Sequence, residues 1–316
     1  MLSLDRLRVL RAVGTHGSVQ AAADALYVSP SAVSQQIAKL EREVGQHLLE
    51  RNGRGVRLTP AAELLTARTT EVLTLLEAIE GDLDDLRDVV AGPVRISAFP
   101  TAARGIGPLL LRDLIDRHPG LEPSLSEHEP TESLPLLARG DIDVVIAQDW
   151  FNAPLALPTG LHRVALFDDV VDIALPCSHR LAKRRTVRLE ELANDGWITW
   201  PAQSICHDWL VHTLRSKGHE PQIRHTAGEH ATQLALVSAG LGFAVMPRLG
   251  RDHIPDGVAI VAVEPTLHRH LFAAWRANAA HRSNIEAVRV SLLHVAATMS
   301  RSRRSPARRR TAVVAG

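Results

Sequence analysis

The first 58 residues place apolar side chains at helical spacing, in short groups separated by polar turns. The first group predicts an amphipathic helix and holds Leu4, Leu7, Leu10 and Val13. Ser18 is a good N-cap for an alanine-rich helix at residues 21–26, and Ser29 caps a third helix with Pro30 in its first position. One face of this third helix is apolar, with Val33, Ile37, Leu40 and Val44. The opposite face is polar, with Ser31, Gln35, Lys39 and Arg42, and Ser34 lies at its flank.

A short helix, a tight turn and a second helix with a polar outer face are typical of a DNA-binding helix-turn-helix. On that face Gln35 can pair with adenine, and Lys39 or Arg42 can neutralise a phosphate. Residues 48–51 and 56–58 are short extended segments around an Asn-Gly turn and predict a hairpin, or wing, with Arg54 at its tip. The alternative is an ordinary helical bundle whose polar face is merely solvated.

Residues 60–91 form the longest predicted helix, which Thr59 caps and Pro60 begins. Its apolar seam repeats at heptad spacing and holds Leu65, Val72, Ile79 and Leu86, then Leu76, Leu83 and Val90 four residues after the last three. Thr69 is the polar break in this seam, and Gly92-Pro93 is expected to end the helix. Because one narrow apolar seam needs a partner, we interpret the segment as a dimerisation helix. A helix packed on its own domain is the alternative.

Beyond residue 92 strand and helix patterns alternate, which predicts βαβ units, a parallel sheet and two open α/β lobes. The predicted strands are 94–98, a segment around Leu125, 143–147, 164–166, 171–175, 198–200 and 243–246. The predicted helices are 102–118, 134–139, 189–193, 207–217, 233–239 and 284–298.

The predicted domains are 1–59, 60–91 and 92–300, of α+β multidomain class. Lobe 1 takes about 92–164 and 266–300, and lobe 2 takes about 165–265. The arginine-rich tail at 301–316 is expected to be disordered.

Composition narrows the function classes. A chain of 316 residues with 45% hydrophobic and 22% charged residues is globular and long enough for about two domains. Its 36 basic and 35 acidic residues give a formal charge of +1. No apolar run suits a membrane span or a secretory signal, and no CxxC, HExxH, GxGxxG, GxxxxGK[ST] or GxSxG motif occurs. We therefore expect a cytoplasmic protein without metal or cofactor. A regulator is favoured over a solute-binding module, and over an enzyme because no compact set of catalytic groups is found.

The N-terminal segment closely resembles the LysR-type transcriptional regulators. The resemblance is carried by Ala21-Ala22-Ala23-Asp24-Ala25-Leu26, Val28-Ser29-Pro30-Ser31-Ala32-Val33-Ser34-Gln35-Gln36-Ile37, Leu48-Leu49-Glu50-Arg51 and Gly53-Arg54-Gly55-Val56-Arg57-Leu58-Thr59. It continues in Leu137-Ala138-Arg139-Gly140-Asp141-Ile142-Asp143 and in Leu236-Val237-Ser238-Ala239-Gly240-Leu241-Gly242-Phe243-Ala244-Val245-Met246-Pro247. Many members carry Arg where this chain has Gln35, which leaves the base preference open.

The resemblance implies a winged helix-turn-helix, a dimerising linker helix and a two-lobed effector domain similar to periplasmic binding proteins. The implied DNA-binding residues are Ser29, Pro30, Ser31, Ser34, Gln35, Lys39, Arg51 and Arg54. The implied partners are double-stranded promoter DNA, a small-molecule effector and further copies of the chain as a homodimer or homotetramer. RNA polymerase is an open candidate.

The effector is expected between the lobes, beyond the carboxyl ends of strands and near helix N-termini. This logic, together with the resemblance, selects Thr101, Glu127, His128, Gln148, Trp150, Trp200 and Ser204, with Glu229 as a weaker candidate. The alternatives are that Thr101 only caps a helix, that Trp150 and Trp200 are packed aromatics, and that His128 is a surface residue. The acids favour a cationic ligand and the helix N-termini an anionic one, so the charge of the effector stays open.

The two cysteines, Cys177 and Cys206, leave two hypotheses. They either form a redox switch or are free buried thiols, and their 29-residue spacing favours the second because it carries no motif.

Overall fold

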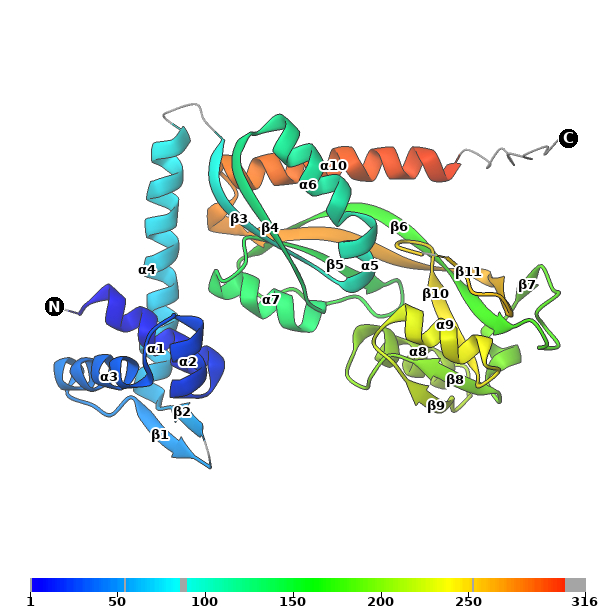
Figure 1. Cartoon of the computed structure of the whole chain (residues 1–316), viewed down its shortest axis with the longest axis horizontal. Helices are drawn as coiled ribbons and strands as arrows, with labels where there is room; N and C mark the ends of the chain where they lie inside the picture. Colours follow the sequence, from blue (N-terminus) through cyan, green and yellow to red (C-terminus); the bar gives the residue numbers. More distant parts are fainter. Residues whose placement is uncertain (1, 54, 86–89, 252, 305–316) are drawn as a thin grey trace, which may run out of the picture. The chain divides into compact units, whose positions relative to one another are not determined.

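The computed structural model describes residues 2–53, 55–85, 90–251 and 253–304 and divides the chain into two compact units (Figure 1). One unit ends at Gly81 and the other begins at Asp82. The first contains α1 (Leu4–His16), α2 (Val19–Ala25), α3 (Pro30–Val44), β1 (Leu49–Asn52), β2 (Gly55–Leu58) and most of α4 (Pro60–Asp85). The second contains β3 (Ala91–Ala98), α5 (Pro100–Gly105), α6 (Gly107–Arg117), β4 (Gly120–Glu127), α7 (Pro130–Arg139), β5 (Val144–Trp150), β6 (Leu161–Pro176), β7 (Thr186–Val187), η1 (Leu189–Leu192), β8 (Gly196–Thr199), α8 (Ile205–Arg215), β9 (Gln222–Thr226), α9 (His230–Ser238), β10 (Phe243–Pro247), β11 (Val258–Arg276), η2 (Ala277–Ala279) and α10 (Ser283–Arg304).

The first unit is a winged helix-turn-helix, as predicted. Ser18 and Ser29 cap α2 and α3 by accepting the amide protons of Ala21 and Ala32. Its core is made of small and aliphatic side chains, namely Leu10, Val13, Ala22, Ala23, Val33, Ile37, Leu40, Leu48 and Ala62. β1 and β2 pair antiparallel in the predicted wing, and the amide of Val56 donates to the carbonyl of Gly17 at 3.2 Å. The wing is thereby attached to the turn between α1 and α2.

Helix α4 begins as predicted, because Thr59 Oγ1 accepts from the amide of Ala62 and donates to the carbonyl of His47. The described helix ends at Asp85, and Leu86 lies outside the described residues. Two predictions about its end are wrong. Val90 is not helical but packs on the core of the second unit, and Gly92-Pro93 belongs to β3. The strand accepts Pro93 here, although proline cannot donate to a sheet ladder.

The second unit is built on a nine-stranded sheet of order β4-β3-β5-β11-β6-β10-β8-β9, with β7 pairing to β11. It is mixed and not all-parallel, so that prediction is corrected. β3 pairs parallel with β4 and β5, β8 with β9 and β10, and β7 with β11, but β11 runs antiparallel to β5 and β6, and β6 runs antiparallel to β10. The two strands predicted at 164–166 and 171–175 are one long strand, β6.

The long strands β6 and β11 join two hydrophobic cores. Leu271, Ala273 and Trp275 of β11 pack in one core with β3, α6 and α10, and Val261 and Val263 pack in another with η1, β8 and α8. The N-terminal part of β6 packs against the first core, and its C-terminal part belongs to the second. Two lobes are thus connected by continuous strands, which is a hinge geometry (Figure 1). The exact domain and lobe boundaries remain predictions.

Two helical predictions and the prediction of a disordered tail need correction. The helix expected at 102–118 is two helices, α5 and α6, which meet at Ile106. Pro108 has no amide proton to continue the first helix, and Gly107 lies so close to Leu125 that a Cβ would approach its side chain to 2.6 Å. The segment at 189–193 is a 3₁₀ helix. The tail prediction is wrong at residues 301–304, which continue α10, and residues 305–316 lie outside the described residues.

Candidate functional site

The polar face of α3 is the first candidate site. Val33, Ile37 and Leu40 are buried in the core of the winged domain, and this fixes the direction of the opposite face. Every DNA-binding candidate on or next to this helix is exposed, namely Ser29, Pro30, Ser31, Ser34, Gln35 and Lys39. Helix α3 therefore presents hydrogen-bonding groups and a cation along one exposed face, as a recognition helix requires.

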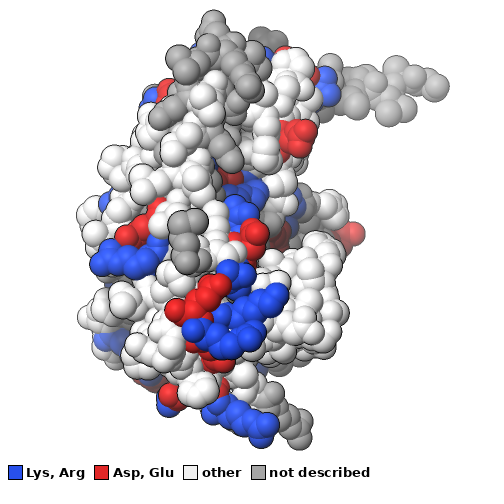
Figure 2. Space-filling model, turned by 90° about the vertical axis from the view of Figure 1, so that its left-hand side faces the viewer, with Lys and Arg blue, Asp and Glu red and all other residues white. Residues whose placement is uncertain are grey.

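The wing offers a second exposed surface, on which Arg51 is exposed and Arg54 lies outside the described residues. Arg57 forms an ion pair with Glu50 across the two strands, at 2.6 Å. Figure 2 shows basic side chains interspersed with acidic ones on the displayed face, rather than one continuous basic field.

Sequence reasoning missed one exposed residue beside the recognition helix. Tyr27 lies in the turn between α2 and α3 with a left-handed φ of 54°, and its side chain is 96% exposed. A large aromatic residue in a turn was the available signal, because a solvent-facing ring in a DNA-binding unit can contact sugar or base.

The second candidate site is a cavity of about 760 Å³ in the second unit. Four predicted effector residues line it, namely Glu127, Trp200, Ser204 and Glu229. The other lining residues are Pro100, Arg104, Glu129, Thr131, Glu132, Pro201, Ala202, Gln203, Gly228, His230 and Ala231. Helices α5, α7, α8 and α9 all begin at this cavity, which matches the expected position of a ligand in a two-lobed α/β domain.

The chemistry of the cavity is dominated by carboxylates. Burial raises the pKa of Glu129; Arg269 opposes this rise, whereas the charges of Glu132 and Glu127 add to it. His230 forms an edge-on contact with the ring of Trp200, at 5.3 Å between ring centres. Burial lowers the pKa of His230 to about 3, and nearby arginines act in the same direction, so its imidazole is neutral at pH 7.

The remaining effector candidates lie elsewhere than on this cavity wall. Thr101 does not cap α5. Its Oγ1 accepts from Arg269 Nη2 at 2.8 Å, and it lines a smaller pocket of about 70 Å³. His128 is half-buried, and its Nδ1 lies 3.1 Å from Ser97 Oγ. Trp150 is buried and stacks on Trp209 at 3.6 Å between ring centres, and Trp200 is also buried.

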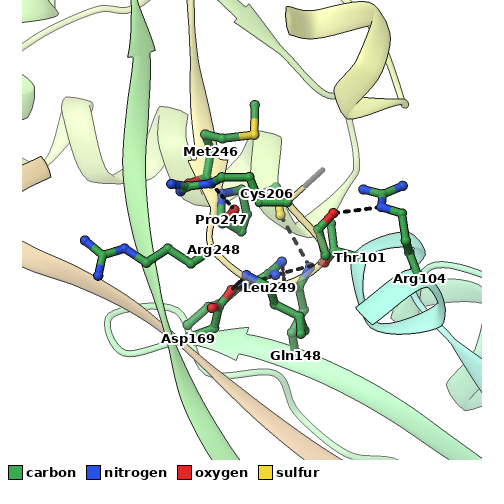
Figure 3. Close-up of polar contacts among 12 residues, drawn as sticks. Thr101, Arg104, Gln148, Asp169, Cys206, Met246, Pro247, Arg248 and Leu249 are labelled. Carbon is green, nitrogen blue, oxygen red and sulfur yellow. Dashed lines mark hydrogen bonds and ion pairs between the residues drawn. The ribbon is translucent and has the colours of Figure 1, made fainter. Parts of the chain in front are cut away.

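A buried polar network lies behind the cavity, where β6 and β11 pass between the lobes. Arg269 is 1% exposed and donates from Nε and Nη2 to Asp169 Oδ2, at 3.0 and 2.9 Å. It also donates from Nη1 to Gln148 Oε1, and Gln148 Nε2 lies 3.4 Å from Cys206 Sγ. Figure 3 shows Thr101, Gln148, Asp169 and Cys206 converging from α5, β5, β6 and α8. Arginine is seldom fully buried, so this network could not be predicted from the sequence.

The cysteines are both free in the structure, and Cys177 is exposed, so the expectation of two buried thiols is wrong for Cys177. Burial raises the pKa of the Cys206 thiol to about 12. The thiol rather than the thiolate therefore predominates at neutral pH, which weakens Cys206 as a nucleophile.

Within the described residues, no cluster of three His, Cys, Asp or Glu side chains is arranged to hold a metal ion. None of the described helices has the length and apolar character needed to span a membrane.

Comparison with known proteins defines the family. The model described as LysR substrate binding domain matches residues 87–297, and that of the bacterial regulatory helix-turn-helix protein, lysR family, matches residues 4–63. The chain belongs to the LysR family of transcriptional regulators. Its N-terminal unit is a DNA-binding helix-turn-helix, its C-terminal unit is an effector-binding domain, and the protein is a regulator rather than an enzyme.

Individual relatives agree with this assignment. A probable hydrogen peroxide-inducible genes activator of Streptomyces viridosporus is 28% identical over 295 residues, which cover 92% of this chain and 93% of the relative. A full-length OxyR variant from Pseudomonas aeruginosa has a similar fold, with a TM-score of 0.70 at 23% identity over 92% of this chain and 95% of that one. Full-length CbnR complexed with its target DNA gives a TM-score of 0.59 at 23% identity, over 92% and 100% of the two chains.

Proposed function

We propose that the chain binds an operator through the exposed face of α3 and through the wing, with Gln35 reading a base edge and Lys39 and Arg51 holding phosphates. The observation that carries this proposal is the fixed orientation of α3, whose apolar face is buried and whose polar face is exposed along its length. Ser29, Ser31 and Ser34 lie toward the start of the same helix and would contact phosphates or base edges near its N-terminus. The wing residue Arg54 completes the proposed set.

A second copy of the chain is the proposed partner of α4. Its first turns pack on the winged domain through Ala61, Ala62 and Leu65, and Thr69 and Leu73 are also buried. Further along, Val72, Leu76, Ile79 and Leu83 of the predicted seam are exposed, and together they form an apolar stripe on one side of the helix. Two such stripes would bury each other in an antiparallel or parallel pair. The homotetramer would be a pair of these dimers, working in the cytoplasm where its DNA partner lies.

The cavity of about 760 Å³ is the proposed effector site, with Glu127, Trp200, Ser204 and Glu229 in its wall. We propose that the effector selects one arrangement of the lobes, since a ligand shifts an equilibrium only by its difference in affinity for the two states. The network of Arg269 touches both α5 and β5 and would transmit that choice. The four predicted effector residues that do not line the cavity would then act from behind its wall or from outside it. They are Thr101, His128, Gln148 and Trp150.

The base contact of Gln35 is tested by Gln35→Ala in a gel-shift titration with the DNA upstream of the chain's own gene. We expect affinity for this DNA to fall about 5- to 150-fold, because a bidentate pair with a base contributes about 1–3 kcal/mol of discrimination. Affinity for unrelated DNA should hardly change. The double variant Gln35→Ala, Arg54→Ala is expected to lose specific retardation.

Gln46→Ala is the matched control, because Gln46 is also an exposed glutamine but follows the end of α3. It should bind both DNAs like the wild type. If Gln35→Ala and the double variant keep the specific retardation of the wild type, the assigned contacts are wrong.

A further inference from the structure

The effector cavity carries more negative than positive charge. Four carboxylates line it, from Glu127 at the end of β4, Glu129 and Glu132 at the start of α7, and Glu229 at the start of α9. Arg104 is the one arginine among its lining residues, and its Nε is already hydrogen-bonded to the carbonyl of Gly250 at 2.7 Å. His230 is neutral at pH 7, as described above. A dicarboxylate or phosphate effector would therefore enter a field of its own sign.

The helix N-termini do not reverse this sign. The N-terminal end of a helix carries roughly half a positive charge. The N-cap residues of α7 and α9 are Glu129 and Glu229, and neither carboxylate makes a capping hydrogen bond to its own helix. Ser204 caps α8 with a neutral hydroxyl, which accepts from the amide of His207. Helix α5 has only six residues. An anion at the start of α7 or α9 would therefore lie close to a carboxylate of the protein.

A buried polar atom at the same cavity lacks a partner. His230 is only 8% exposed, and its Nε2 has no hydrogen-bond partner among the described residues. In a neutral imidazole, the ring nitrogen that carries no hydrogen can accept a hydrogen bond from an N–H donor. A buried polar group without a partner is unfavourable, and a ligand in the cavity that offers an N–H would supply the missing hydrogen bond.

We propose that the effector is a cationic small molecule, with ammonium or guanidinium groups held by Glu127, Glu129, Glu132 and Glu229 and an N–H that reaches His230. This inference rests on the proposed function of the cavity as the effector site. A volume of about 760 Å³ accommodates a molecule from the size of a basic amino acid or diamine upward.

The same charges explain how such a ligand would act on the lobes. Glu127, Glu129 and Glu132 belong to β4 and α7, and α7 packs with β5, whereas Glu229 begins α9, which packs with β10. Bringing these walls together without a counter-charge would crowd like charges in a dehydrated space. A cation between them removes this repulsion, so it binds the closed arrangement more tightly than the open one. Effector binding therefore shifts the two lobes toward the closed arrangement.

The test is a thermal-shift series on the full chain with two matched panels at equal concentration. The cationic panel holds putrescine, cadaverine, agmatine, spermidine, lysine and arginine, and the anionic panel holds succinate, glutarate, adipate and citrate. At least one cation should raise the melting temperature and be bound saturably in isothermal titration calorimetry, and no anion should. Stabilisation by an anion, or by no cation of the panel, would overturn the proposal.

Substitutions of the cavity carboxylates test where the cation binds. Glu129→Gln combined with Glu229→Gln keeps the size of both side chains, and it should weaken binding of the active cation at least about tenfold, because each charged hydrogen bond is replaced by a weaker one. Glu122→Gln is the control, since Glu122 is exposed on β4 and does not line the cavity. Unchanged affinity in the double variant would also overturn the proposal. Specific DNA binding, measured on the same samples, separates this outcome from a failure of the regulator function.

Discussion

Replacing Arg269 with Met should lower the free energy of unfolding of the C-terminal unit by about 3–5 kcal/mol, because it leaves a buried carboxylate without its counter-charge. Asp169 is 0% exposed, and its Oδ2 receives two bonds from Arg269 and one from the amide of Leu249. Methionine fills a similar volume but donates nothing to Asp169, Gln148 or Thr101. Urea unfolding followed by tryptophan fluorescence measures the change. All five tryptophans lie between residues 150 and 275, so the signal reports on this unit.

The control for Arg269 is Arg215→Met, which removes an arginine that pairs with Glu220 on the surface. It should leave the urea midpoint nearly unchanged, because exposed ion pairs are screened by water and salt. Asp169→Leu combined with Arg269→Met should recover part of the lost stability, since both charges are then gone. If Arg269→Met lowers the free energy of unfolding by less than about 1 kcal/mol, the buried pair of Arg269 and Asp169 does not stabilise the unit as predicted.

Ile79→Arg should convert the assembled protein to monomers and abolish tight binding to the operator. Ile79 is 55% exposed on the apolar stripe of α4. Burying such a side chain contributes about 1.5–3 kcal/mol, and a twofold pair loses it twice, so the dimer should weaken about 10²- to 10⁴-fold. Two arginines facing each other add repulsion. Sedimentation velocity gives the mass of the assembly, and the gel-shift titration gives the affinity for DNA.

Ala67→Arg adds the same charge to another side of α4, at an exposed position outside the stripe. This variant should keep the assembly and the DNA affinity of the wild type. If Ile79→Arg also sediments as the wild-type assembly, α4 is not the dimerisation surface. The alternative, a helix packed on its own domain, is then favoured.

The N-terminal unit was predictable from sequence because its signals are local. The caps at Ser18, Ser29 and Thr59 and the turn at Gly53 act within a few residues of themselves, and the structure confirms the helices and the wing that they indicate. The sheet of the second unit was less predictable because strand order depends on distant pairing. Strand β11 was missed entirely. Glu264-Pro265 and the polar run at residues 268–270 interrupt its apolar pattern.

The candidate sites show the same difference between local signals and distant pairing. The face of α3 follows from helical periodicity, so its exposed residues were identified correctly as a group, although their contacts with DNA stay predictions. The cavity depends on which helix starts the fold brings together. Glu127, Trp200, Ser204 and Glu229 were selected, but Glu132 and His230 were not, because nothing in their local sequence indicates a shared cavity. The pairing of Arg269 with Asp169 joins residues 100 positions apart, which no local pattern shows.

Sequence-specific DNA binding can be tested by in vitro selection with the full-length chain, from a random pool of double-stranded DNA at physiological salt. We expect enrichment of a single motif made of two inverted half-sites, which the chain binds at least about 10³-fold more tightly than pool DNA. The motif should change or fade when the selection is repeated with Gln35→Ala. Recovery of no common motif, with equal affinity for every fragment, would show that the chain does not recognise a DNA sequence.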